Sequence, residues 1–187
     1  MSIDVIDTTN EINNLFKKAK VYAEENDIEY IVIFAKGIKN VLNLNNLLKG
    51  SGIRLLVTTF PSNQVLYLEN EEGVIEEEHP EILNQDSLDI LRVEQIKLIS
   101  STLPLEPIII PGLQNNPYES INKTLDIFGD GVSIAVQSVL MSTDTGNIKP
   151  STRVLSLTAG LAIDTEATNS RFLFHPTKGL KIQHIIK

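Results

Sequence analysis

The sequence contains no cysteine, no tryptophan and only three histidines among its 187 residues. The absence of cysteine excludes disulfide bonds, thiolate metal sites and cysteine nucleophiles. His79, His175 and His184 do not have the spacing of paired metal ligands, so a structural or solvent-exposed role is the simpler interpretation of each. The G-x-S-x-G, G-x-G-x-x-G and P-loop lysine motifs are also missing. The sequence therefore contains no recognisable catalytic constellation, and we expect no bound metal.

Long apolar runs and basic clusters are missing as well. No stretch reaches the roughly 18 to 20 apolar residues that span a bilayer, and residues 1–14 do not resemble a signal peptide. We therefore expect a cytoplasmic protein that does not bind membranes. The formal net charge is −8, and a chain without a Lys/Arg cluster is a poor candidate for binding the phosphate backbone of nucleic acid.

The acidic residues are unevenly distributed, because six glutamates lie between Glu69 and Glu78. A solvated surface is the simpler interpretation of this run, and a docking surface for a basic partner is the alternative. The length and the hydrophobic content of 42% indicate a single α/β domain over 1–187, with an acidic excursion at about 61–80.

Apolar, β-branched runs of strand length alternate with amphipathic stretches along much of the chain. We expect strands at 28–34, 53–58, 96–100 and 154–157, separated by helices. Strands joined through helices by short connections imply right-handed crossovers and a parallel sheet.

The remaining segments carry weaker patterns. The sequence predicts the following elements: a short strand at 65–68, a helix opened by Pro80, a surface loop over 102–116, a helix from Pro117 capped by Asn116, and an antiparallel hairpin of 171–174 with 180–186. Residues 132–144 have helical periodicity, with Asp130 as the expected cap and Gly146 as the stop. The expected polar face of this helix carries Ser133, Gln137, Ser138 and Asp144.

Four segments carry a resemblance to a known family. They are Phe128-Gly129-Asp130-Gly131-Val132, Asp144-Thr145-Gly146-Asn147-Ile148, Val154-Leu155-Ser156-Leu157 and Asp164-Thr165. In this order they resemble the stand-alone proteins, mainly archaeal and bacterial, that are related to the C-terminal α/β domain of pyruvate kinase. The resemblance implies a three-layer α/β/α fold whose mixed, mostly parallel sheet ends in an antiparallel strand or hairpin. It also implies that the chain is not a pyruvate kinase, because the barrel that carries that enzyme's catalytic residues is absent.

The same resemblance implies a phosphorylated ligand, either flavin mononucleotide (FMN) as a cofactor or a sugar phosphate. The sequence departs from the family at the loop after the first strand, where 34–40 has lost the usual hydroxyl side chains. Lys36, Lys39 and the N–H groups near Gly37 are the substitutes that this loop offers. A glutamate usual in the family is replaced by Gln137, and a later glycine-rich loop is reduced to Ala159-Gly160.

Ligands of open parallel sheets bind beyond the carboxyl ends of the strands, and small or hydroxyl-bearing residues stand at three of the four expected ends. The candidate ligand-binding residues are Lys36, Gly37, Asn40, Thr58, Thr59, Ser101, Thr102, Thr158, Gly160, Asp164 and Thr165.

Three functions fit this pattern. The first is a binding protein for a small phosphorylated molecule. The second is a flavin-dependent enzyme, for which Lys36, Asp144 and Asp164 are the available proton donors or nucleophiles. The third is a non-catalytic scaffold with an eroded ligand site that assembles with itself as a homo-oligomer or with a partner.

Overall fold

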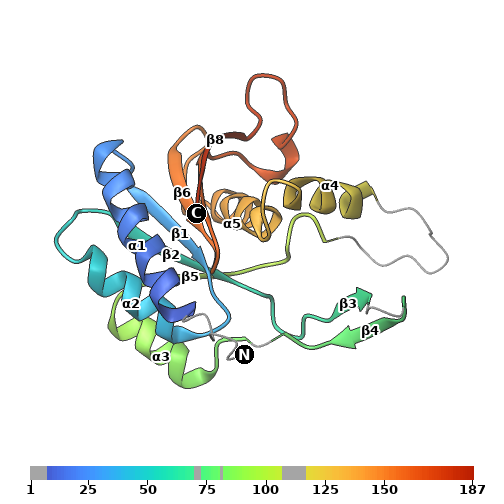
Figure 1. Ribbon diagram of the computed structural model, residues 1–187, viewed down its shortest axis with the longest axis horizontal. Helices are drawn as coiled ribbons and strands as arrows, with labels where there is room; N and C mark the ends of the chain where they lie inside the picture. Colours follow the sequence, from blue (N-terminus) through green and yellow to red (C-terminus); the bar gives the residue numbers. More distant parts are fainter. Residues whose placement is uncertain (1–7, 70–72, 81, 107–116) are drawn as a thin grey trace, which may run out of the picture.

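The computed structural model describes residues 8–69, 73–80, 82–106 and 117–187, and shows a mixed sheet with helices around it (Figure 1). The elements in chain order are α1 (Thr8–Glu25), β1 (Tyr30–Phe34), α2 (Ile38–Leu48), β2 (Arg54–Thr59), β3 (Leu66–Glu69), β4 (Ile75–Glu78), α3 (Gln85–Val93), β5 (Lys97–Ser100), α4 (Pro117–Asp126), α5 (Val132–Asp144), β6 (Arg153–Leu157), β7 (Ala162–Glu166), a 3-10 turn (Ser170–Phe172) and β8 (Lys181–Ile186).

The main sheet has six strands in the order β5-β2-β1-β6-β7-β8. The first four are parallel, β7 runs antiparallel to β6, and β8 runs antiparallel to β7. The sequence prediction of a mostly parallel mixed sheet with an antiparallel C-terminal part is confirmed. None of the described helices is long and apolar enough to cross a membrane.

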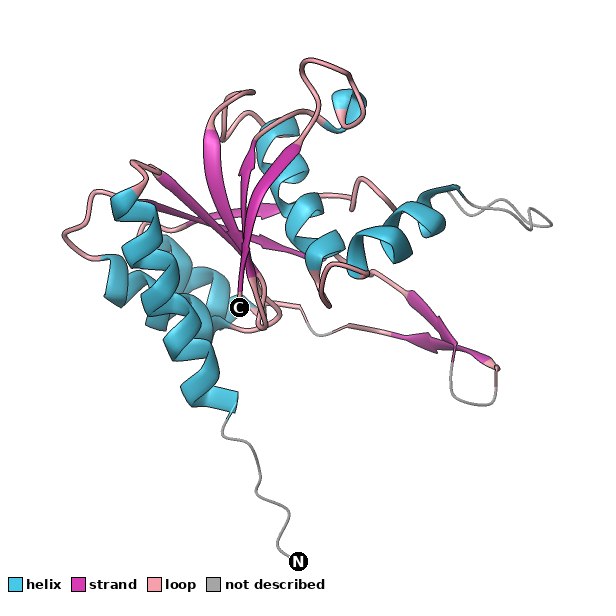
Figure 2. Ribbon diagram, turned by 45° about the horizontal axis from the view of Figure 1, so that its top comes forward, coloured by secondary structure: helices cyan, strands magenta, loops and turns pink. Residues whose placement is uncertain are grey.

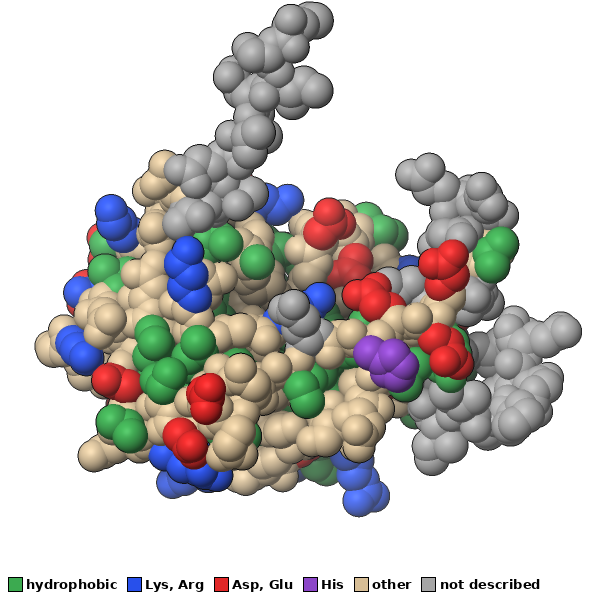
Figure 3. Space-filling model, turned by 90° about the horizontal axis from the view of Figure 1, so that it is seen from below, with side chains coloured by type: hydrophobic (Ala, Val, Ile, Leu, Met, Phe, Trp, Pro, Cys, Tyr) green, Lys and Arg blue, Asp and Glu red, His purple; other side chains and the backbone are tan. Residues whose placement is uncertain are grey.

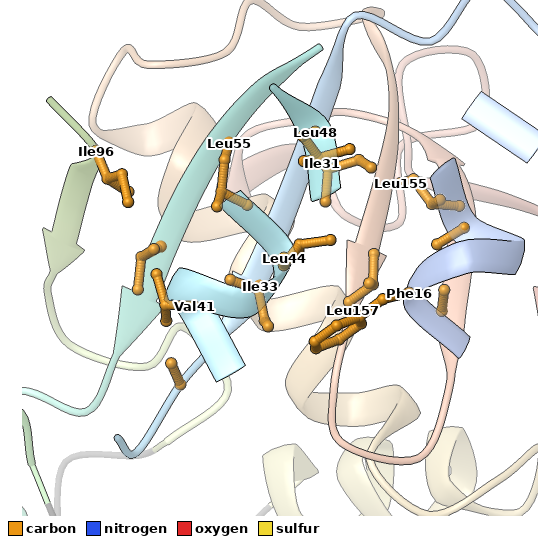
Figure 4. Close-up of a cluster of buried hydrophobic side chains, with 14 of the residues drawn as sticks. Phe16, Ile31, Ile33, Val41, Leu44, Leu48, Leu55, Ile96, Leu155 and Leu157 are labelled. Carbon is orange, nitrogen blue, oxygen red and sulfur yellow. The ribbon is translucent and has the colours of Figure 1, made fainter. Parts of the chain in front are cut away.

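Both faces of the central strands are buried, which explains why their sequences are continuously apolar. Alternate residues point to opposite faces. Ile31 and Ile33 of β1 pack with α1 and α2, a cluster drawn in Figure 4. Val32 packs on the other face, with Val139 and Met141 of α5. The helices that follow β1 and precede β6 therefore cover different faces of the sheet (Figure 2).

Helix α5 is buried on nearly every side, which corrects the prediction of a polar face. Gln137 and Ser138 are 1% and 0% exposed, and Ser133 is also buried. The Gln137 Oε1 atom accepts a hydrogen bond of 2.9 Å from the Leu105 N–H, and the Ser138 hydroxyl donates to the Ile134 carbonyl at 2.9 Å. Polar side chains can line this buried helix because each has a partner.

The cap of α5 also differs from the prediction. Asp130 is exposed, and the residue before the helix is Gly131, with φ +90°. The carboxylate of Asp126, in α4, accepts hydrogen bonds from the Ser133 N–H at 2.9 Å and the Ser133 hydroxyl at 2.8 Å. A Cβ atom on Gly131 would lie 3.1 Å from the Thr158 Oγ1 atom, so this glycine allows α5 to begin against the end of β6.

The predicted C-terminal hairpin is wrong in its first strand. Residues 170–172 form the 3-10 turn, and the partner of β8 is β7. β7 follows β6 through a tight turn in which the Thr158 N–H donates to the Leu161 carbonyl at 2.9 Å. The strand was hidden in the sequence because Asp164 and Thr165 interrupt its apolar pattern.

The acidic excursion contains an exposed two-stranded hairpin, β3 with β4, that extends away from the main sheet on the side opposite α1, α2 and α3 (Figures 1 and 2). Only its first strand was predicted. Helix α3 begins later than predicted, at Gln85 and not at Pro80, because the Asn84 side chain accepts a hydrogen bond of 2.9 Å from the Ser87 N–H. The predicted cap at Asn116 and most of the predicted loop at 102–116 lie outside the described residues.

Candidate functional site

A cleft of about 650 Å³ lies at the carboxyl end of β1 and β6. It is lined by Phe16, Ile33, Phe34, Ala35, Lys36, Gly37, Lys39, Asn40, Phe60, Leu66, Glu78, Glu106, Gly131, Ile134, Thr158 and Ala159. The topology explains its position. The chain leaves the carboxyl end of β1 for α2 on one face of the sheet, whereas α5 on the other face begins at the same edge, where Gly131 lies beside Thr158, so the cleft lies at the starts of two helices on opposite faces.

One wall of the cleft is positively charged. Gly37, the residue before α2, is extended, with φ −144° and ψ 160°, and no side chain caps the helix. The first N–H groups of α2 are therefore available, and the helix dipole favours an anion there. Lys36 and Lys39 flank this helix end, and neither forms an ion pair with a described residue.

The surface between the walls is apolar. Phe34 and Phe60 meet edge to face with their ring centroids 4.9 Å apart, and the Lys36 Nζ atom lies 5.8 Å from the centre of the Phe60 ring. Phe16 and Ile134 complete this surface from α1 and α5. Such a surface suits the ring or carbon skeleton of a ligand, and polar groups at its edges fix orientation.

Two carboxylates also line the cleft, Glu78 from β4 and Glu106 from the segment after β5. Burial raises the pKa of Glu106 above the ordinary value, because a carboxylate taken out of water loses hydration of its charged form. The backbone next to Glu106 is fixed by the hydrogen bond from the Leu105 N–H to Gln137. Gln137 of α5 therefore holds the backbone beside Glu106 in place.

We expect the Glu106→Gln variant to be more stable than the unmodified protein at neutral pH. A folded-state pKa above the unfolded value means that the contribution of Glu106 to stability is fully present below the unfolded pKa and is lost as pH rises through the folded pKa. The difference in melting temperature between the two proteins should therefore shrink as pH falls from 7 to 4. The exposed Glu77→Gln variant is the control. A difference that is constant with pH would contradict the assignment.

The structure brings together four of the predicted site residues in this cleft: Lys36, Gly37, Asn40 and Thr158. The others lie elsewhere. Thr58 is buried and its hydroxyl donates to the Ser138 Oγ atom at 2.9 Å, which ties β2 to α5. Thr59 is also buried, and its hydroxyl has no hydrogen-bond partner among the described residues.

Three further candidates do not line the cleft. Ser101 and Thr102 follow β5, the edge strand of the sheet, two strands away from β1. Gly160 lines a separate depression beside α1, together with Lys18 and Lys187 among others.

Asp164 and Thr165 are not at the carboxyl edge, which corrects their expected position. Both are fully buried within β7. The Asp164 carboxylate accepts hydrogen bonds from Arg153 Nη2 at 2.6 Å, Arg153 Nε at 3.0 Å and the Tyr22 hydroxyl at 2.9 Å. Burial and the hydrogen bond to Asp164 raise the pKa of Tyr22. Thr165 donates to the Lys181 carbonyl at 2.8 Å, so both residues tie neighbouring segments together.

Asp144, considered as a proton donor, lies at the far end of α5 and accepts hydrogen bonds from Asn169 Nδ2 at 3.1 Å and the Ser170 N–H at 3.0 Å. Phe34, Phe60, Glu78 and Glu106 line the cleft but were not among the predicted site residues. The two phenylalanines had a usable signal, because Phe34 ends one predicted strand and Phe60 follows another by two residues. Glu106 had none, because nothing in a loop sequence shows which side chains point back to the sheet.

No group of three or more histidine, cysteine, aspartate or glutamate side chains that could hold a metal ion occurs within the described ranges. Comparison with models of protein families gives no match, and comparison with curated proteins gives none either. The functional assignment therefore depends on the cleft itself.

Proposed function

We propose that this protein binds a small phosphorylated molecule, such as a sugar phosphate or FMN, in the cleft at the carboxyl edge of β1 and β6. The observation that carries the proposal is the uncapped N-terminus of α2 opening into this cleft between Lys36 and Lys39. N–H groups and two lysines supply the hydrogen bonds and charge that a phosphate requires. The volume of about 650 Å³ is within the range of small-molecule sites.

The resemblance to stand-alone relatives of the pyruvate kinase C-terminal domain supports the same proposal. We propose with it the three-layer α/β/α arrangement of that family and a cytoplasmic location. The proposal includes no pyruvate kinase activity. The N-terminus of α5 also lies near the cleft, but it is the weaker phosphate site, because the Asp126 carboxylate already accepts hydrogen bonds there from the Ser133 N–H and the Ser133 hydroxyl.

We expect the Lys36→Ala/Lys39→Ala variant to bind phosphorylated ligands at least tenfold more weakly than the unmodified protein. Each exposed lysine that contacts a phosphate directly contributes on the order of 1 kcal/mol, and two together exceed the 1.4 kcal/mol that equals a tenfold change. Isothermal titration with FMN, glucose 6-phosphate and fructose 1,6-bisphosphate measures the change.

The matched control is Lys49→Ala, which removes the same charge from the opposite end of α2, where the side chain is 61% exposed. Equal weakening by both variants would indicate a general charge effect. The absence of binding by all three ligands at millimolar concentration would refute the proposal.

A second candidate is an assembly module, because an apolar groove lies between α4 and the segment at 170–175. Tyr118 and Phe174 are 44% and 73% exposed, and Leu173 and Phe174 line both of the adjoining depressions that make up the groove. If this groove joins two copies of the chain, sedimentation should show a dimer that Phe174→Glu dissociates. A monomer at every concentration would exclude this candidate.

A further inference from the structure

The cleft is lined by charged groups of both signs. Lys36, Lys39, Glu78 and Glu106 all line it, and none of the four forms an ion pair with a described residue. The four come from three separate segments: the β1–α2 connection with the first turn of α2, the β3–β4 hairpin, and the segment after β5. Their meeting at one cleft is therefore a property of the fold, not of one charged stretch of sequence.

The elements that carry Lys39 and Glu78, α2 and the β3–β4 hairpin, are separated in space (Figure 1). The hairpin and α2 lie on opposite sides of the carboxyl edge (Figures 1 and 2). Figure 3 looks onto this edge from below, and acidic side chains gather over the part of the face where the hairpin lies. The apolar side chains of Phe34, Phe60 and Ile134 line the same cleft as the four charged side chains.

A ligand with negative charge alone does not fit this arrangement. It would be attracted to Lys36 and Lys39 but would bring its charge into a cleft that also contains two carboxylates. The charge of the Glu106 carboxylate is not neutralised by an ion pair with any described residue, and burial raises the pKa of its carboxyl group. A cationic group on the ligand would remove the repulsion and supply the charge that a half-buried carboxylate requires.

We infer that the ligand of this cleft carries a protonated amine in addition to its phosphate. The phosphate binds at the N-terminus of α2, the ring or carbon skeleton covers Phe34 and Phe60, and the amine binds between Glu78 and Glu106. This inference depends on the proposed function and deepens it, because it selects amino-sugar phosphates and aminated ring phosphates over FMN and neutral sugar phosphates.

The test uses two matched pairs of probes that differ in the amine: glucosamine 6-phosphate with glucose 6-phosphate, and pyridoxamine 5′-phosphate with pyridoxine 5′-phosphate. We expect the aminated member of at least one pair to bind tenfold or more tightly than its partner in isothermal titration. In the Glu78→Gln/Glu106→Gln variant this preference should disappear, whereas the affinity for the amine-free member should be unchanged or higher.

Both replacements keep the size of the side chain, and neither glutamate is fully buried, so the variant is expected to fold. Glu77→Gln, on the same strand as Glu78 but outside the lining of the cleft, is the control and should keep the preference. Equal affinities within both pairs would overturn the inference and leave the phosphate site intact. A preference that survives in the double variant would also overturn it. The absence of binding by all four probes would refute the phosphate site and the inference together.

Discussion

Replacement of Arg153 by methionine is expected to lower the free energy of unfolding by about 3–5 kcal/mol, because it leaves a buried carboxylate without its charge partner. Asp164 is 0% exposed, and its Oδ1 atom has Arg153 as its only described hydrogen-bond donor. The Tyr22 hydroxyl would then be the remaining described donor to the carboxylate. Asp164→Asn should cost less, because it removes the buried charge itself and leaves an Arg153 side chain that is 38% exposed and can be hydrated.

Denaturant unfolding measures both variants. The matched control is Lys181→Met, which removes a cation from the exposed pair with Glu166 on the adjacent strand and should cost less than about 1 kcal/mol. A loss in Arg153→Met as small as that in Lys181→Met would show that Asp164 is hydrated, in contradiction to its burial within β7.

Phe16→Ala is expected to destabilise the protein by about 3–5 kcal/mol, the usual cost of deleting a buried phenyl ring. Phe16 is 2% exposed and packs in the cluster formed by α1, α2 and the central strands (Figure 4). Because Phe16 also lines the cleft, its removal opens the cleft toward the core and should weaken ligand binding along with stability.

The matched control is Phe128→Ala, since Phe128 is 60% exposed and its loss should change stability by less than about 0.5 kcal/mol. Thermal and denaturant unfolding of the two variants should differ accordingly. Similar stabilities for Phe16→Ala and Phe128→Ala would contradict the position of α1 on the sheet.

The parallel part of the fold could be predicted from the sequence because its physical cause is local. β1, β2 and β6 are buried on both faces, and this burial requires uninterrupted apolar, β-branched runs. The stop signals between them are equally local. Gly146, for example, has φ +75° after α5.

The parts that were missed depend on distant partners. β7 contains a buried Asp164, which is acceptable only because Arg153 and Tyr22 reach it from β6 and α1. Likewise, α5 was assigned a polar face because nothing near Gln137 in sequence shows that Leu105 covers it. Periodicity alone cannot separate a polar side chain in water from one with a buried partner.

The cleft was predicted in part for a topological reason. Once the strands are placed, the carboxyl ends of β1 and β6 must adjoin, which brings Lys36, Gly37 and Thr158 into one site. Glu78 and Glu106 could not be predicted, because their positions depend on how the hairpin and the segment after β5 fold back over that edge.

Phosphate binding at the N-terminus of α2 can be followed by amide chemical shifts during ligand titration. In a ¹⁵N-labelled sample titrated with glucose 6-phosphate and glucosamine 6-phosphate, we expect the largest saturable shifts at the backbone amides of Gly37, Ile38 and Lys39. Shifts that are absent there, or that occur instead at the start of α5 or at Ser101 and Thr102, would contradict it.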